Sequence, residues 1–178
     1  MIFTEKIYRF STKEILIMSI EKVRAFFAPL GREQDILEFS VSSATVELAA
    51  QAVGVEGARI AKTLAFADKE GGCLLVVAAG DGKISNRRFK DTFGFKAKML
   101  SHDDTAAMTG HAVGGVCPFA LPEHVTVYCD RSMQRFETVF PAAGSSNSAI
   151  ELTCEELFRY AGAKAWVDVC DIPQPPAE

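Results

Sequence analysis

Hydrophobic and polar residues recur along this chain with two different periods, and each period predicts a type of element. A spacing of three or four between apolar residues predicts an amphipathic helix opened by Ser19 and a second helix over residues 45–53. Alternation over residues 60–67 predicts a strand with one larger, more apolar face. The near-continuous apolar run 73–79 predicts a buried central strand.

The second half of the chain continues in the same irregular order. Helices are predicted over residues 85–93, from Ser101 to Gly110, and from a capping box of Thr153 with Glu156. Further strands are predicted at 35–40, 96–100, 125–129, 138–140, 149–152 and 165–170. Such a mixture, with several hairpin-length links, predicts an α+β fold. We expect a single domain with a curved, barrel-like, mixed and mostly antiparallel sheet flanked by helices.

The length of 178 residues is that of one domain and can bury a full core without disulfides. We expect an N-terminal extension at 1–18, a functional domain at 19–171 and a flexible tail at 172–178. No apolar run approaches membrane-spanning length, and the first residues lack the apolar core of a signal peptide. These features predict a cytoplasmic protein with no membrane partner.

Charge and cysteine content narrow the function classes. The net charge of −4 argues against a protein that coats nucleic acid, although a local pocket could still recognise one end of an RNA. The five cysteines include no CxxC or zinc-type Cys/His spacing, so we expect no metal and a reducing compartment. Positive charge is concentrated in one stretch, which comprises Lys83, Arg87, Arg88, Lys90, Lys96 and Lys98. Two interpretations are open: these residues contact the phosphates of an RNA acceptor stem, or they form a solvated helix face.

Two glycine-rich segments are the most distinctive feature of the chain. They are GHAVGGVCP at 110–118 and GSSNSAIE at 144–151. Glycine lacks a Cβ, so such loops let backbone amides approach a ligand closely. Lys62 places a charge on the apolar face of the strand over 60–67. Together these features predict a pocket for an anionic or carbonyl-bearing ligand.

Six segments carry a family resemblance. They are residues 42–53 followed by Gly54, IAKTLAF (60–66), AAGDGK (78–83), GHAVGGVCPFAL (110–121), VYCD (127–130) and FPAAGSSNSAIEL (140–152). In this order they resemble the YbaK/prolyl-tRNA-synthetase-associated family of aminoacyl-tRNA editing domains. The resemblance implies a free-standing deacylase that hydrolyses the ester of mischarged tRNA(Pro), of the Cys or Ala type. It implies no cofactor, the tRNA acceptor end as a transient partner, and prolyl-tRNA synthetase as a possible second one.

The resemblance also implies site residues. Lys62 would anchor the terminal phosphate or orient the ester, while Gly144 and Ser145 would hold the oxyanion or the water. The implied substrate-binding residues are Thr63, Gly114, Gly115, Val116, Cys117, Pro118, Asp130 and Ser146. Three of these features have a purely structural alternative. Lys62 could be a snorkelling side chain, the 144–148 segment a hairpin turn, and Asp130 a helix cap. Ala149 stands where some family members carry an aspartate.

Two other functions remain open from the sequence. A thiol-dependent hydrolase would use Cys117 with His111, six residues earlier, as its base. A non-catalytic module would bind tRNA or an amino acid without releasing product. Family chemistry requires no enzyme thiolate, so Cys117 is expected to line the pocket.

Overall fold

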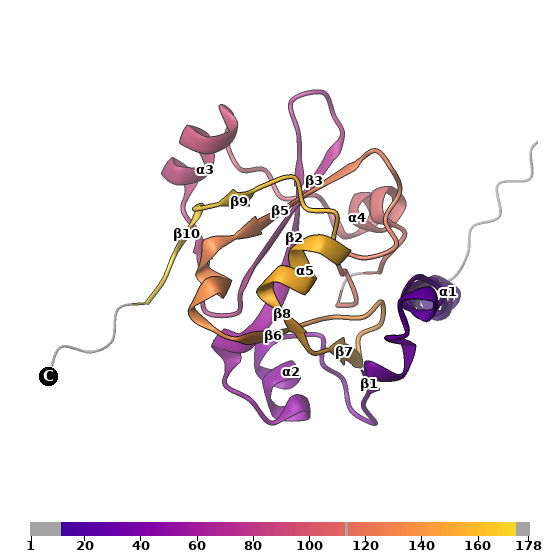
Figure 1. Cartoon of the computed structure of the whole chain (residues 1–178). Coiled ribbons are helices and arrows are strands. Elements are labelled where there is room, and N and C mark those ends of the chain that lie inside the picture. The colour runs from indigo at the N-terminus through magenta and orange to yellow at the C-terminus, as the bar shows by residue number, and fades with distance from the viewer. Residues whose placement is uncertain (1–11, 113, 174–178) are drawn as a thin grey trace, which may run out of the picture.

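A pair of long strands organises the fold. The computed structural model describes residues 12–112 and 114–173; the predicted tail beyond 173 and the first eleven residues of the predicted extension lie outside them. β2 (Ile60–Ala67) and β3 (Cys73–Ala79) pair antiparallel over seven residues. They lie at the middle of a six-stranded sheet (Figure 1).

The sheet is mixed, as the sequence predicts. Its order is β8 (Leu152–Thr153), β6 (Thr138–Pro141), β2, β3, β5 (Val125–Asp130) and β9 (Trp166–Val167). Two small pairs add β1 (Ile36–Glu38) with β7 (Ser148–Ile150) and β4 (Lys83–Ile84) with β10 (Cys170–Asp171). Of the seven strand pairs in the described residues, four are antiparallel. The predicted curved α+β domain is confirmed.

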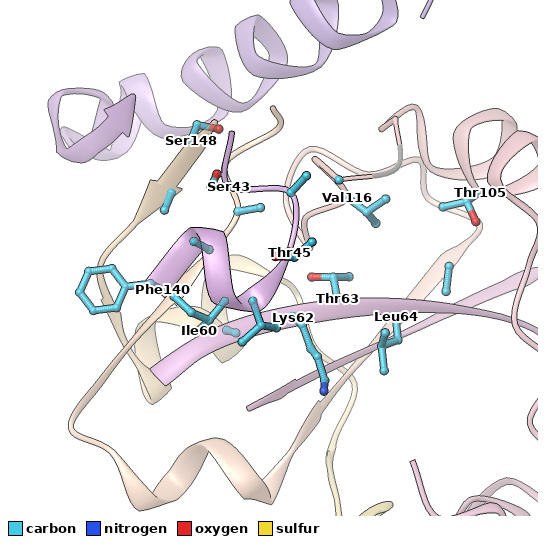
Figure 2. Close-up of a pocket in the computed structure, with 18 of the residues that line it drawn as sticks. Ser43, Thr45, Ile60, Lys62, Thr63, Leu64, Thr105, Val116, Phe140 and Ser148 are labelled. Carbon is cyan, nitrogen blue, oxygen red and sulfur yellow. The ribbon is translucent and has the colours of Figure 1, made fainter. Parts of the chain in front are cut away.

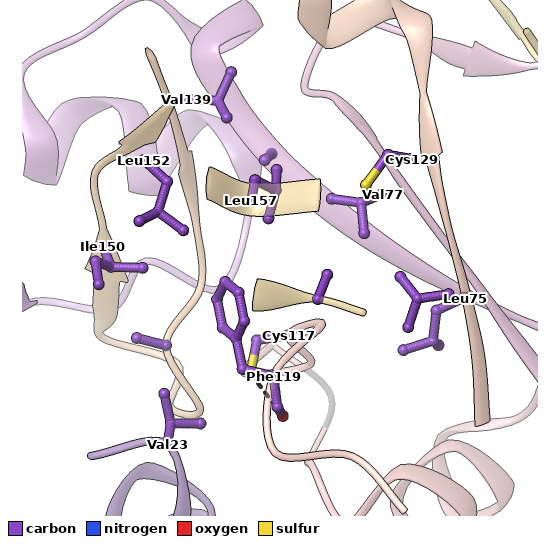
Figure 3. Packing of buried hydrophobic residues seen from close by; sticks show 14 of the residues in the cluster. Val23, Leu75, Val77, Cys117, Phe119, Cys129, Val139, Ile150, Leu152 and Leu157 are labelled. Atoms are coloured by element: carbon purple, nitrogen blue, oxygen red, sulfur yellow. Dashed lines mark hydrogen bonds between the residues drawn. The ribbon is translucent and has the colours of Figure 1, made fainter. Parts of the chain in front are cut away.

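Helices lie on both faces of the sheet. They are α1 (Thr12–Phe27), α2 (Val46–Val53), α3 (Asn86–Phe93), α4 (His102–Thr109) and α5 (Cys154–Tyr160). β3 alternates between the faces: Leu75 packs in one cluster with Val23 of α1 and Leu157 of α5 (Figure 3), while Val76 packs in another with Phe89 of α3. This placement explains why every residue of β3 is buried.

Side-chain caps define where several helices begin. The side chains of Thr45, Ser101 and Thr153 each accept a hydrogen bond from a backbone N–H in the first turn of the helix that follows. The predicted capping box is present, because Glu156 also accepts from the Thr153 N–H.

Three element predictions are wrong in their bounds. The predicted strand 149–152 is divided into β7 and β8, which pair with different strands. The first helix begins at Thr12, so Ser19 is a buried residue inside it and not its cap, and the predicted domain boundary at residue 18 falls within α1. The predicted strand 165–170 is two short strands. It breaks because the Val169 N–H donates to the Asp130 carboxylate, and the Val169 carbonyl accepts from Ser85 in place of a β5 partner.

A further element prediction is also wrong. Residues 96–100, predicted as a strand, form only one isolated bridge, between Phe66 and Met99. This segment therefore pairs with β2 at one point and does not extend the sheet.

Gly144 fits where no other residue would. Its φ is +94°, and a Cβ built there would lie 2.8 Å from the Ser19 carbonyl oxygen and 3.0 Å from the Ile20 Cα. The loop thus packs directly on the α1 backbone, which cannot retreat as a flexible side chain could.

We predict that Gly144→Ala lowers the free energy of unfolding by at least about 3 kcal/mol, because strained backbone and overpacking add. Urea unfolding measures the change. Gly31→Ala is the matched control: its φ of +68° carries the same type of strain, but nothing lies within 4 Å of the new Cβ, so a loss of only about 1–2 kcal/mol is expected. Equal losses in the two variants would contradict the packing of this loop on α1.

Candidate functional site

A cavity of about 280 Å³ lies along β2 (Figure 2). The start of α2, the first turn of α4, the 114–116 loop and the β6–β7 connection enclose it. Its wall consists mostly of small side chains and short hydroxyl side chains; these include Ser43, Ala44, Thr45, Ala49, Ala61, Thr63, Ala65, Thr105, Gly114, Ala142, Ser148 and Ala149. Met99, 62% exposed, and His102 also line it. The cavity therefore fits a small group that has both apolar and hydrogen-bonding parts.

The outer edge of β2 is paired at both ends and open between them. At one end β6 pairs in parallel with Ile60 and Ala61. At the other end the Ala65 carbonyl accepts from the Leu100 N–H, and the Ala67 N–H donates to the Lys98 carbonyl. Thr63 lies between these two partners, in the stretch of β2 that borders the cavity.

Thr63 also carries an unusual hydroxyl. Its Oγ1 is the single buried side-chain polar atom without a hydrogen-bond partner in the part of the chain that the structure describes. Figure 2 shows this side chain directed into the cavity, toward Val116 and Thr45. An unpaired buried hydroxyl costs free energy, about 1–3 kcal/mol, that a polar ligand can recover.

Lys62 lines the same cavity but directs its ammonium elsewhere. Nζ donates to the Gly80 carbonyl at 2.9 Å and to the Gly82 carbonyl. In Figure 2 the ammonium points to the side of β2 opposite Thr63. Burial lowers the pKa of the ammonium. The predicted convergence of this cation with the two glycine loops is therefore absent: its hydrogen bonds go to the turn after β3.

The two glycine loops do meet each other. A Cβ on Gly115 would lie 2.9 Å from the backbone of Ser145, and one on Gly114 would lie 3.5 Å from the Ser146 Cβ. Gly114 and Val116 border the cavity, as does Ser148. The other predicted residues of these loops do not border the cavity; they are Gly115, Cys117, Pro118, Gly144, Ser145 and Ser146.

Within the second loop the hydroxyls bond one another. Ser145 Oγ donates to Asn147 Oδ1 at 3.0 Å and lies 2.8 Å from Ser148 Oγ, whose hydroxyl can donate to it. The Ser146 carbonyl accepts from the Ser43 N–H. Neither Gly144, Ser145 nor Ser146 is among the residues that border the cavity. The prediction that Gly144 and Ser145 hold an oxyanion thus has no geometric support in this conformation.

Cys117 belongs to the core and not to the cavity. It is 0% exposed and lies beside Phe119 (Figure 3), in the core cluster that also contains Val23. Burial raises the pKa of its thiol to about 12, so the nucleophilic thiolate is scarce at neutral pH. Its expected position as a pocket-lining residue is therefore wrong, and a thiol-dependent hydrolase is disfavoured. Pro118, the next residue, is also absent from the cavity wall.

Asp130 is a structural residue. Its carboxylate accepts hydrogen bonds from the N–H groups of Ser132, in the 3-10 helix Arg131–Arg135, and of Val169. It is fully buried and does not border the cavity. The capping alternative is confirmed, and the substrate-binding prediction finds no contact to support it.

A buried polar chain ties α1 to the first glycine loop. His111 Nε2 lies 2.9 Å from the Phe119 carbonyl, which can only accept, so Nε2 carries the proton. Nδ1 then accepts from the Ser19 hydroxyl. Burial lowers the pKa of His111, and the charge of Lys22 acts in the same direction. The ring is therefore held neutral.

Sequence reasoning missed several hydroxyl residues of the wall, namely Ser43, Thr45, Thr105 and Ser148. Their only signal was their place at or next to helix starts and turns, where such residues are common anyway. In the described ranges 12–112 and 114–173, no three His, Cys, Asp or Glu side chains gather in a metal-binding arrangement. None of the described helices combines the length and apolar character needed to cross a bilayer.

A family model described as "Aminoacyl-tRNA editing domain" matches residues 41–160. The chain belongs to this family. Every residue that borders the cavity lies within the matched range. The resemblance seen in the lysine strand and the glycine loops is confirmed.

Two curated relatives differ in whether their names state a function. The chain is 53% identical over 153 residues to the uncharacterised protein YwhH of Bacillus subtilis (strain 168). The match covers 86% of this chain and 98% of that protein. The chain is 27% identical over 114 residues, 64% of this chain and 70% of the relative, to a candidate Cys-tRNA(Pro)/Cys-tRNA(Cys) deacylase, EbsC, of Enterococcus faecalis (strain ATCC 700802 / V583).

A solved structure extends the likeness to three dimensions. The crystal structure of a candidate trans-editing enzyme for prolyl tRNA synthetase superposes with a TM-score of 0.77 at 25% identity. The match covers 86% of this chain and 97% of that one. The shared editing-domain fold thus includes nearly the whole of that protein.

The neutral state of His111 predicts a pH dependence of stability. The unfolded state, with a histidine pKa near 6.5, binds a proton that the folded state resists, so stability falls as pH drops below about 6.5. The loss attributable to this residue approaches about 1.4 kcal/mol per pH unit. Urea unfolding of His111→Gln between pH 7.5 and 5 should show a shallower slope than the parent protein, by up to that amount per unit (about 1.4 kcal/mol).

His124→Gln, at an exposed position, serves as the control and should keep the parent slope. Parallel pH profiles for His111→Gln and the parent protein would show that His111 is not held neutral by the fold.

Proposed function

We propose that this chain is a free-standing aminoacyl-tRNA deacylase that hydrolyses the ester of mischarged tRNA(Pro), removing small amino acids such as cysteine or alanine. The observation that carries the proposal is the coincidence of the editing-domain match with the cavity, since residues 41–160 contain its entire wall. Two of the relatives described above bear names that refer to prolyl-tRNA editing or Cys-tRNA deacylation.

The cavity supports the size of the proposed substrate. Its volume of about 280 Å³ and its wall of alanines and short hydroxyl side chains suit a small aminoacyl group. Exclusion by apolar fit alone provides only about 10–200-fold discrimination, so proline is expected to be cleaved slowly and not absolutely excluded.

Hydrolysis in such a cavity requires water, a polarised ester carbonyl and a leaving ribose. Water adds to the carbonyl carbon, the bond from that carbon to the ribose oxygen breaks, and the ribose oxygen takes a proton. The free amino acid and intact tRNA are the products. Hydrogen-bond donors directed at the carbonyl oxygen stabilise the charge that develops there.

Lys62 keeps a role in this proposal that differs from a simple phosphate clamp. An ammonium donates three hydrogen bonds, and two go to the Gly80 and Gly82 carbonyls. The third donor lies on the side of β2 opposite the Thr63 side chain, so it would meet an oxygen of the terminal nucleotide only where the acceptor end passes over that side. The tRNA acceptor end is thus the proposed partner, with prolyl-tRNA synthetase as a second partner in line with the naming of its structural relative.

The test is a panel of tRNA(Pro) charged with cysteine, alanine, serine or proline, incubated with the purified protein. We expect release of at least one small non-proline amino acid at a kcat/KM about 10-fold or more above that for proline. The measurement is loss of radiolabelled amino acid from the tRNA. Binding of the charged tRNA without any release would instead identify the non-catalytic module and end the proposal.

Lys62→Met tests the role of the ammonium, because methionine retains an unbranched stem that can cover the same apolar surface. We expect kcat/KM for the best substrate of the panel to fall about 10-fold or more, as loss of one charged hydrogen bond predicts. Lys98→Met, at an exposed lysine beside the cavity, is the matched control for a general loss of positive charge. Equal effects in the two variants would exclude a specific role for Lys62.

A further inference from the structure

We propose that the aminoacyl group binds to the open edge of β2 as if it were one residue of a neighbouring strand, paired with the backbone of Thr63. The inference rests on the proposed function, since it assigns the binding mode of that same substrate. It states which groups of the protein bind the α-amino group and the ester carbonyl of the substrate. A shared family fold does not by itself identify these contacts.

The direction of the Thr63 backbone groups follows from its neighbours. In a strand, the N–H and C=O of alternate residues point to the same edge. Ala65 and Ala67 direct hydrogen bonds to residues 98–100, on the outer edge. Residues 61 and 63 therefore face the same outer edge, away from β3.

No described residue occupies this edge at Thr63. β6 pairs only with Ile60 and Ala61, and it ends at Pro141. The next residue, Ala142, forms an isolated bridge with Ala149, and no described residue is hydrogen-bonded to the Thr63 backbone on this edge. Within residues 12–112 and 114–173 the N–H and C=O of Thr63 thus meet the cavity without a backbone partner.

An aminoacyl ester has the groups that this edge lacks. Its α-amino group donates and its carbonyl oxygen accepts, and both are attached to one α-carbon as in a peptide residue. In an antiparallel hydrogen-bonded pair, two residues exchange both of their backbone bonds. The α-amino group would donate to the Thr63 carbonyl, and the ester carbonyl would accept from the Thr63 N–H.

This arrangement links binding to the reaction. The Thr63 N–H would point at the oxygen that gains negative charge when water adds to the carbonyl carbon, as an oxyanion donor does. The unpartnered Oγ1 of the same residue is an independent sign that a polar group belongs beside it. In this inference the Thr63 N–H of β2 stabilises the oxyanion, in place of the second glycine loop that the sequence suggested.

The test compares two non-hydrolysable probes that differ only in the α-amino group. They are 3′-deoxy-3′-(alanylamino)adenosine and 3′-deoxy-3′-(propionylamino)adenosine, in which an amide replaces the ester. Calorimetry with the full-length protein should show that the alanyl probe binds about 10-fold or more tightly, as one charge-assisted hydrogen bond predicts. Equal affinities would overturn the inference. Because this readout is binding, it stands apart from the hydrolysis panel that tests the proposed function.

Two Thr→Val variants separate backbone from side-chain recognition. Thr63→Val removes the hydroxyl but keeps the N–H and C=O, so the ratio of the two affinities should be unchanged. Thr126→Val makes the same substitution on β5, away from the cavity, and should change neither affinity. A ratio that falls to one in Thr63→Val alone would mean that the side chain holds the amino group, which would overturn strand-like pairing.

Amide hydrogen exchange locates the contact. Saturation with the alanyl probe should slow exchange of the Thr63 N–H about 10-fold or more, because an open-edge amide becomes hydrogen-bonded. An unchanged Thr63 rate in the complex would contradict the proposed bond.

Discussion

The uneven pairing of β2 is the constraint on which the site depends. β3 occupies one edge of this strand over seven residues, whereas β6 and residues 98–100 divide the other edge and leave Thr63 between them. Backbone groups in a sheet interior are almost always paired with protein or water, so a gap of this type beside a cavity offers an edge that a ligand can fill. The cavity exists because neither neighbour of β2 continues past that point.

The walls of the cavity are held by contacts that leave no room for larger residues. Gly115 packs against the backbone of Ser145, and Gly144 packs against α1 near Ser19. Ser19 in turn hydrogen-bonds to His111, at the start of the other glycine loop. α1 precedes the range matched by the editing-domain model, yet it supports both glycine loops. The helix is therefore part of the structure that shapes the site.

The sequence predicted what local patterns determine. Alternation in residues 60–67 identified β2, and Thr153 with Glu156 identified the start of α5. The meeting of two glycine loops also followed from their composition and the family resemblance. Long-range partners were beyond reach: no local pattern shows that the Lys62 ammonium binds carbonyls of the turn after β3, or that Cys117 faces the core. The gap at Thr63 depends on where β6 ends, which only tertiary structure reveals.

The central claim is that a substrate completes the edge of β2 at Thr63. The most direct measurement is a crystal structure of the protein with 3′-deoxy-3′-(alanylamino)adenosine bound. The account predicts the α-amino nitrogen within about 2.7–3.2 Å of the Thr63 carbonyl oxygen, and the probe's carbonyl oxygen at a similar distance from the Thr63 nitrogen. A probe whose alanyl group lies against the 114–116 loop or the 144–148 loop, with the Thr63 backbone still unpaired, would contradict it.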